Sequence, residues 1–179
     1  MLIKRKNLIY NFAFVILFVL ASCRSKNEVS KSNSGSEKEL KNNSGKLSSL
    51  LGISEKEIKN KRIYLFVEEW YGTPYLFGGN SKSGTDCSGL TKNIYLEVYK
   101  KNLARTAGSQ FDQCEKISPN NLKQGDLLFF KIESKSITHV GVYLINTKFV
   151  HASTKRGVMV SDLNENYFKK YFFAAGRPK

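Results

Sequence analysis

The spacing of apolar residues divides the chain into a helical part followed by a strand-rich part. Ile58, Leu65 and Phe66 fall roughly on one face of a helix, which this pattern extends to about Tyr71. The segment ISEKEI is typical of a capping box, in which Ser54 caps the first turn of the helix. The pattern therefore predicts a helix near the start of the folded region.

A second helix fits residues 87–101, because Leu90, Ile94 and Val98 are spaced by four positions. Asp86 lies at its N-terminal edge. The segment between the two helices contains residues that interrupt helices: Gly72, Pro74, Gly78 and Gly79. We therefore expect a loop there.

Beyond Pro119 the helical period gives way to short runs of β-branched and aromatic residues, separated by turn residues. The five runs are GDLLFFKI, HVGVYLI, KFVHAS, GVMVSDL and YFFAAGR. Helices followed by a series of strands indicate an α+β fold with an antiparallel sheet. We therefore predict N-terminal helices that pack on an antiparallel β-sheet.

The first residues have the layout of a secretory signal. A basic start at residues 4–6 precedes an apolar run from Phe12 to Ala21, which is short for a permanent transmembrane helix. The sequence LASC ends this run and resembles the lipobox of bacterial lipoproteins, in which Cys23 is acylated. The alternative is ordinary signal cleavage that leaves Cys23 as a free thiol.

The residues after Cys23 are rich in Ser, Asn, Lys and Glu and lack aromatic side chains, so they cannot bury enough apolar surface to fold. We therefore expect three parts along the chain. These are a lipoprotein signal peptide over residues 1–22, the acylated cysteine with a flexible tether over residues 23–50, and a folded domain over residues 51–179.

The composition suits a domain that folds on an apolar core. The 179 residues are 41% hydrophobic and 12% aromatic, and the three cysteines are too few for a disulfide scaffold. A formal net charge of +14 suits anionic envelope polymers and lipid headgroups as partners. No nucleic-acid motif accompanies the basic residues, so we expect no nucleic-acid partner.

Cys87 is the candidate nucleophile. It lies in the sequence TDCSGL, in the first turn of the predicted second helix, and a helix N-terminus or a nearby imidazole lowers the pKa of a thiol. The only two histidines, His139 and His151, both lie in the strand-rich half. A cysteine on a helix that pairs with a histidine on a strand is the arrangement of papain.

Each candidate also has a structural interpretation. Cys87 can form a disulfide with Cys114, His139 can be a core histidine on an apolar strand, and Tyr75 can be a packing residue. A zinc site formed by the histidines, Cys87 and a carboxylate would lack a close ligand pair such as HxxxH or CxxC. We therefore expect no metal.

The chain resembles the NlpC-type cell-wall cysteine peptidases, which are papain-like hydrolases of bacterial peptidoglycan stem peptides. Six segments carry the resemblance in order and spacing: GTPYLFGG, TDCSGL, ARTAGSQ, GDLLFF, THVGVYL and FVHAS. The resemblance runs from about Ile58 to Arg177. It implies a papain-like fold, with residues 51–179 as the peptidase domain.

The resemblance also implies roles for single residues. Cys87 corresponds to the nucleophile, His139 to the general base and His151 to the polar residue that orients this base. Tyr75 corresponds to a tyrosine that faces the cysteine and helps the oxyanion site together with the backbone N–H of Cys87.

The residues beside the nucleophile, Asp86 and Ser88, correspond to substrate contacts, in which the acidic side chain receives a free stem-peptide amine. Arg105, Thr106 and Gln110 match a family segment, and we assign them a structural role only.

The function that the resemblance implies is a cysteine endopeptidase without a cofactor. By family analogy the scissile bond lies beside a D-configured residue, either D-Glu to the diamino acid within a stem or D-Ala to the diamino acid across a cross-link. Two alternatives stay open: a non-catalytic peptidoglycan-binding lipoprotein, and an amidase or transferase on the same fold. The implied partners are stem peptides and, through a lipid anchor on Cys23, a membrane. We expect a monomer in the cell envelope, at the outer membrane if the source has one.

The two histidines are not adjacent in a simple hairpin. If Thr147 is the apex, Tyr143 lies opposite His151, and His139 sits four residues further along the same face, about 13 Å away at the rise of a strand. Strong coiling of the sheet, a bulge or another pairing must close this gap. The contact between the histidines therefore rests on the resemblance.

Overall fold

The computed structural model describes residues 51–52 and 60–179. The predicted signal peptide, Cys23, the tether and the helix start at Ser54 lie outside these residues. Within the described ranges, no helix is both long enough and apolar enough to cross a membrane.

Helix α2 spans Lys61–Trp70 and begins where the Asn60 side chain accepts a hydrogen bond from the backbone N–H of Arg62 at 3.0 Å. Its buried residues follow a helical period: Ile63, Tyr64, Phe66, Val67 and Trp70. A helix up to Trp70 is confirmed, but the prediction of one helix that includes Ile58 is wrong, because Asn60 is extended and caps a helix that begins at Lys61. The buried face is also shifted from the predicted one. Leu65 is only half-buried, because a helix turns by about 100° between Leu65 and the buried Phe66.

Helix α3 spans Cys87–Ile94, and the chain continues as a π-helical turn, η2, over Tyr95–Tyr99. The turn ends at Lys100, whose φ of 58° lies in the left-handed region. Leu90 and Ile94 are fully buried, as their spacing predicts. The second predicted helix is therefore confirmed, with a change of helix type in its last part.

Six antiparallel strands form one sheet in the order β3-β8-β4-β5-β6-β7. The strands are β3 (Cys114–Ile117), β4 (Leu127–Phe130), β5 (His139–Ile145), β6 (Lys148–Ser153), β7 (Gly157–Asp162) and β8 (Phe172–Pro178). The five predicted strands are confirmed, with ends that differ by at most two residues. Strand β3 is additional, and its mostly polar sequence gives no alternating apolar signal.

Short elements complete the described part of the chain. They are the two-residue strands β1 (Asn80–Ser81) and β2 (Gly84–Thr85), the helices α4 (Ala107–Asp112) and α5 (Asn166–Tyr171), and a 3₁₀ turn, η3 (Pro119–Asn121). Helix α4 begins where Thr106 accepts a hydrogen bond from the backbone N–H of Ser109 at 3.2 Å. Helices this short cannot be predicted from the spacing of apolar residues.

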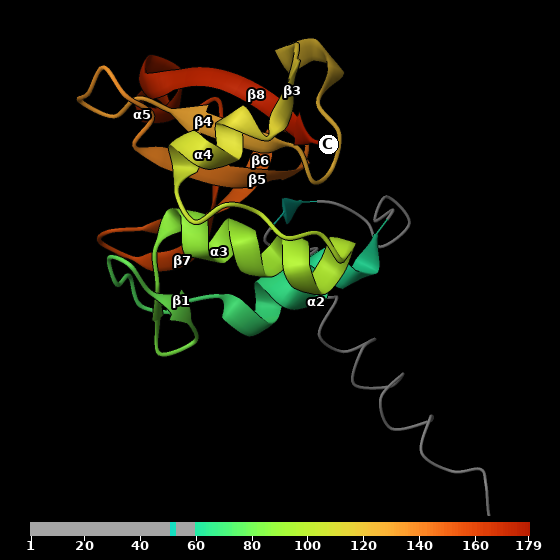
Figure 1. The fold of residues 1–179 in the computed structure, drawn as a ribbon, viewed down its shortest axis with the longest axis vertical. Helices are drawn as coiled ribbons and strands as arrows, with labels where there is room; N and C mark the ends of the chain where they lie inside the picture. The colour runs from blue at the N-terminus through green and yellow to red at the C-terminus, as the bar shows by residue number, and fades with distance from the viewer. Residues whose placement is uncertain (1–50, 53–59) are drawn as a thin grey trace, which may run out of the picture. The chain divides into compact units, whose positions relative to one another are not determined.

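Two apolar layers enclose the sheet. Helices α2 and α3 lie together on one side of it, where the buried Leu90 joins a cluster that includes Val140 (Figure 1). A second cluster on the other face joins Phe130 and Phe149 to Phe168 of α5. All four residues of β4 are buried, because successive side chains enter opposite layers. The structure confirms the α+β class.

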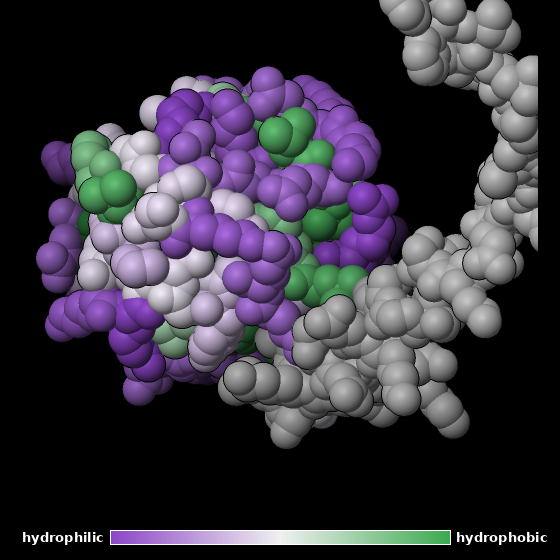
Figure 2. Space-filling model, turned by 90° about the horizontal axis from the view of Figure 1, so that it is seen from below, coloured by the Kyte–Doolittle hydropathy of each residue, from purple (hydrophilic) through white to green (hydrophobic). Residues whose placement is uncertain are grey.

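The surface is mainly polar. Figure 2 shows a face on which hydrophilic residues predominate and apolar residues form small separate patches. The large apolar side chains with substantial exposure are Tyr71, Leu76, Phe77, Leu96, Tyr167 and Phe173. Single exposed apolar residues of this kind are ordinary for a folded domain.

Candidate active site

Cys87 is the first residue of α3, and Asp86 caps the helix by accepting a hydrogen bond from the backbone N–H of Gly89 at 2.7 Å. The Cys87 side chain is buried, and its Sγ lies 4.0 Å from the carbonyl oxygen of Thr138. Thr138 directly precedes His139. The α3 N-terminus is therefore packed against the start of β5, as a helix-borne cysteine and a strand-borne histidine require.

Burial raises the pKa of the Cys87 thiol to about 11. The backbone N–H of Val140 favours the thiolate, but the negative charge of Asp86 opposes it. The sequence predicts a lowered thiol pKa from the helix N-terminus and the imidazole, and this expectation is wrong for the unliganded site. Desolvation in the packed core outweighs the backbone hydrogen bonds that favour the thiolate, so the pKa of Cys87 lies above neutral pH.

His139 and His151 are in direct contact. Nε2 of His139 lies 3.0 Å from Nδ1 of His151, and the ring planes meet at 86°. On its other side, Nε2 of His151 lies 3.1 Å from Oγ of Ser161, a buried residue of β7. The three side chains therefore form one hydrogen-bonded series from the start of β5 to β7.

This series selects a tautomer for each ring. When His139 keeps a lone pair on Nδ1 as a base, its Nε2–H donates to Nδ1 of His151. His151 then carries its proton on Nε2 and donates to Ser161. Sequence analysis missed Ser161; its only signal is a small polar residue at an inward position of an apolar strand.

Both imidazoles are neutral at neutral pH. Burial lowers the pKa of His139 to about 4. The pKa of His151 is lowered well below its usual value by burial first, and then by the neighbouring His139 and the positive charge of Arg156. The resting site therefore contains a neutral thiol and two neutral imidazoles.

A tight turn and a bulge between β5 and β6 bring the histidines together. Asn146 and Thr147 form a two-residue hairpin turn, since both have positive φ, 47° and 64°, and Ile145 pairs with Lys148 on either side of it. A register shift between Tyr143 and Ile145 then adds one residue to β5. The turn therefore has a different apex from the simple hairpin with Thr147 at its tip.

Beyond the bulge, Val142 pairs with Val150, and continuation of this register places Gly141 opposite His151. His139 is then two residues away along the same face, about 7 Å at the rise of a strand. Side chains on such diagonal positions can meet. The bulge thus brings His139 and His151 closer together than a simple hairpin would.

The Asp86 carboxylate accepts hydrogen bonds from other residues of the protein. Arg105 donates to both carboxylate oxygens, from Nη1 to Oδ1 at 2.9 Å and from Nη2 to Oδ2 at 2.8 Å, and also donates to Ser88 Oγ at 3.0 Å. The backbone N–H of Gly78 is a further donor at 2.9 Å. Burial raises the pKa of Asp86, but the hydrogen bonds from Arg105, Gly89 and Gly78 together hold it below the usual value.

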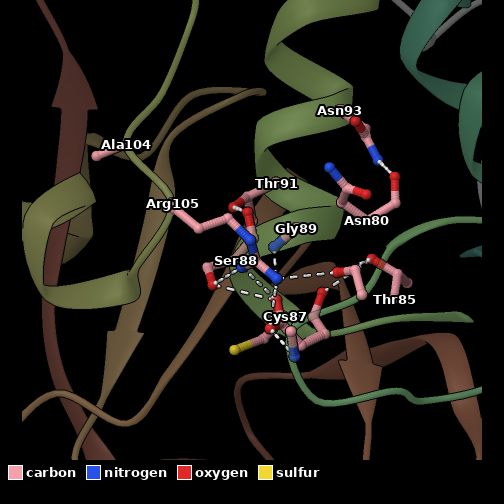
Figure 3. A network of polar contacts seen from close by, with 12 residues as sticks. Asn80, Thr85, Cys87, Ser88, Gly89, Thr91, Asn93, Ala104 and Arg105 are labelled. Atoms are coloured by element: carbon pink, nitrogen blue, oxygen red, sulfur yellow. Dashed lines mark hydrogen bonds and ion pairs between the residues drawn. The ribbon is translucent and has the colours of Figure 1, made fainter.

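Figure 3 shows this network at the start of α3, with the Cys87 sulfur directed away from Arg105. Asp86 and Ser88 face Arg105 from the helix N-terminus. The substrate contact that we expect for Asp86 and Ser88 stays a prediction. Arg105 is the residue whose importance the sequence analysis underestimated, because a cation nineteen positions away leaves no local pattern.

Tyr75 lies near Cys87, whose thiol acts on the pKa of the Tyr75 phenol. Its backbone bridges to Thr85, directly before Asp86. Burial raises the pKa of the Tyr75 phenol, and the nearby Cys87 and Asp86 raise it further. The hydroxyl is therefore protonated at neutral pH and can donate a hydrogen bond.

A cavity of about 470 Å³ adjoins the histidines. Its lining includes Tyr75, His139 and His151 together with the charged residues Lys155, Arg156 and Glu165. Arg156 lies on the tight turn between β6 and β7. The site therefore opens into a pocket with charged walls.

Cys87 and Cys114 are both free thiols, so the disulfide alternative is wrong. Cys114 begins β3, and its Sγ lies 3.1 Å from the carbonyl oxygen of Gln110. Among the residues that the structure describes, no group of three or more His, Cys, Asp or Glu side chains is placed to hold a metal ion.

Comparison with known proteins gives one family. The profile described as the NlpC/P60 family matches residues 72–177. The chain is 37% identical over 141 residues to an Escherichia coli K12 protein named murein DD-endopeptidase MepS/murein LD-carboxypeptidase, over 74% of each chain. It is 39% identical over 112 residues to the probable endopeptidase NlpC of the same organism, over 62% of this chain and 73% of the relative.

A solved structure of a protein similar to lipoproteins, of the NLP/P60 family, from Staphylococcus aureus has a TM-score of 0.60 at 31% identity. The match covers 70% of the present chain and 42% of the Staphylococcus aureus chain. The present chain thus spans about two fifths of that protein's length.

Proposed function

The chain belongs to the NlpC/P60 family, and from this premise we propose that it is a cysteine endopeptidase that hydrolyses amide bonds in peptidoglycan stem peptides. The observation that supports the proposal most directly is the hydrogen-bonded series of His139, His151 and Ser161 beside the buried Cys87. A thiol next to an oriented imidazole is the arrangement that nucleophilic acyl transfer requires.

In the proposed reaction, His139 takes the thiol proton as Cys87 attacks the amide carbonyl, because both groups start neutral. Charge that develops on the carbonyl oxygen is stabilised by the backbone N–H of Cys87 and the hydroxyl of Tyr75. His139 then gives its proton to the leaving amine. In the second half of the reaction it takes a proton from water, whose oxygen releases the acyl group from Cys87.

The position of the bond is inferred from the likeness to the family. We propose cleavage beside a D-configured residue, either D-Glu to the diamino acid or D-Ala to the diamino acid. The relatives named murein DD-endopeptidase support a cross-link bond, and a Bacillus subtilis relative named gamma-DL-glutamyl hydrolase supports a bond to a D-Glu side chain.

The location of the protein is part of the same proposal. We infer acylation at Cys23 and attachment to an envelope membrane through the tether of residues 23–50. The layout of a basic start, an apolar run and LASC supports this inference. Cys23→Ser is expected to release a soluble domain that is still active, whereas a variant that remains in the membrane fraction would point to an uncleaved helix.

Digestion of purified muropeptides, with products weighed by mass spectrometry, tests the activity and the bond together. Cys87→Ala is expected to abolish turnover and Cys114→Ala to keep most of it, since both replace a free thiol and only one is beside His139. Binding of muropeptides without any cleavage would favour the non-catalytic alternative. Products joined to an added amine would favour a transferase.

A further inference from the structure

The cavity beside the histidines is lined by one half of the site, the imidazoles, and not by the other half, the thiol. His139 and His151 both line it, whereas Cys87 is not among the described residues that do. The lining also includes Tyr75, residues of the β6–β7 turn and Phe168 of α5. The cavity therefore borders the imidazoles rather than the sulfur.

The direction of proton transfer decides which half of a substrate enters this cavity. The acyl half becomes bonded to Cys87, so it stays on the side of the sulfur. The leaving nitrogen must reach the proton on His139, so it lies on the side of the imidazole. The cavity that His139 lines is thus placed to receive the fragment that carries the leaving amine.

Two cations stand at the wall of this cavity on a turn that is firmly held. The Ser153 hydroxyl accepts hydrogen bonds from the backbone N–H groups of Lys155 and Arg156, both at 3.3 Å. Gly157 has a φ of +69°, and a Cβ there would meet the carbonyl oxygen of Thr73 at 2.2 Å. Because only glycine permits this approach, the turn is seated against the loop that leads to Tyr75.

The charge at the wall is positive. Lys155 and Arg156 oppose one anion, Glu165, whose carboxylate already accepts a hydrogen bond from the backbone N–H of Asp162 at 2.9 Å. The field of Arg156 reaches the catalytic pair, since it lowers the pKa of His151. An anionic group in the cavity would therefore meet two cations and one anion.

We propose that this cavity binds the leaving fragment and that Lys155 and Arg156 bind a carboxylate carried by its amino acid. The inference rests on the proposed function and adds a specificity to it: the enzyme distinguishes a free carboxylate next to the leaving amine from an amide. Diaminopimelate whose side-chain amine is cross-linked to D-Ala offers such a carboxylate beside that amine. The charge-assisted hydrogen bond is the source of the preference.

The test uses two stem peptides that differ only in the carboxyl group of the leaving amino acid, which is free in one and amidated in the other. The wild-type enzyme is expected to show a kcat/KM about tenfold higher for the free acid, the scale of a charge-assisted hydrogen bond. Lys155→Gln combined with Arg156→Gln is expected to bring the ratio of the two kcat/KM values close to one. Glu165→Gln, which keeps the acceptor for Asp162, is expected to raise the ratio.

A control removes the same charge elsewhere. Lys61→Gln combined with Lys123→Gln changes two exposed lysines that do not line the cavity, and the ratio is expected to stay at the wild-type value. A wild-type ratio near one, or a double variant at 155 and 156 that keeps the full ratio, overturns the inference while the hydrolase activity stands.

If the wild-type protein cleaves neither peptide, the proposed function fails, and a binding measurement still decides the inference. The amine-side product, with its carboxylate free or amidated, is titrated into the Cys87→Ala protein by calorimetry. Tighter binding of the free acid that disappears in the Lys155→Gln/Arg156→Gln background supports the site. Equal affinity for the two products overturns it.

Discussion

Nδ1 of His151 accepts a hydrogen bond from Nε2–H of His139 over 3.0 Å, with the ring planes nearly perpendicular. In this arrangement a neutral imidazole takes the place that an amide or carboxylate can fill beside a general base. His151 is itself held by Ser161 at 3.1 Å. Orientation of the base therefore depends on two residues from two further strands.

Substitution of His151 is expected to give activities in the order wild type, His151→Asn, His151→Ala. An asparagine amide oxygen can accept from Nε2–H of His139, although from a shorter side chain, whereas alanine leaves the ring free to take the wrong tautomer. Loss of an orienting group can cost on the order of 10⁴-fold in rate. Muropeptide cleavage at equal folded concentration measures the series. Equal loss in both variants would mean that the ring itself is needed, and full activity in both would remove His151 from the site.

Ser161 is expected to act as a positioning residue. Ser161→Ala removes the partner of Nε2 of His151 and should lower kcat by about threefold to tenfold, the scale of one net hydrogen bond, with KM little changed. Ser161→Thr keeps the hydroxyl and should recover most of the loss. The nitrogen chemical shifts of His151 report its tautomer directly. A wild-type tautomer in Ser161→Ala would contradict this role.

The pH dependence of kcat/KM should follow the neutral pair. His139 must be unprotonated to act as a base, so activity is expected to rise as the pH increases through about 4 and to stay level across neutrality. The buried thiol ionises only near pH 11. Ultraviolet absorbance of thiolate, with Cys87→Ser as the blank, checks this assignment. A thiolate signal at pH 7 in the free enzyme would show a preformed ion pair instead.

The same burial makes the fold sensitive to acid. The pKa of His139 is about 4 in the folded state against 6.5 for the free side chain, so the unfolded state binds more protons between these values. The contribution of neutral His139 to the free energy of unfolding is fully present above pH 6.5. It is lost as the pH drops towards 4, by roughly 3 kcal/mol from His139 alone. His151 acts in the same direction. Urea unfolding at pH 7, 5.5 and 4 measures the loss, and His139→Gln should flatten it.

Arg105 is expected to matter more to stability than its partly exposed position suggests. Arg105→Leu leaves the Asp86 carboxylate buried without its cation and should cost about 2–3 kcal/mol. Lys82→Ala breaks the exposed ion pair with Glu69 and should cost less than about 1 kcal/mol. Urea unfolding compares the two variants, and similar losses would show that burial of Asp86 is unimportant.

The order of helices and strands could be predicted from the sequence because apolar spacing reports directly on burial. Leu90 and Ile94 mark α3 in this way, and the five long strands follow from their β-branched and aromatic runs. Motifs select Cys87 and the histidines as candidates, and the structure places the two histidines in contact.

The contacts between distant elements could not be predicted. The meeting of His139 with His151 depends on a bulge near Tyr143, and a single added residue leaves no mark in the apolar pattern. The pairing of Arg105 with Asp86 depends on a loop that returns to the start of α3. The high pKa of Cys87 depends on how completely the core closes around it, which spacing does not report.

The position of β8 makes the strands of the candidate site depend on a segment far along the chain. Strands β4 to β7 are neighbours in the sheet in their order along the chain, but Phe172–Pro178 must insert between β3 and β4. Without these residues β4 has an open edge, and β4 is the strand whose Phe130 pairs with His139. Such long-range pairing is slow to form. A chain shortened before Phe172 is therefore expected to lose the support of β5 and its activity.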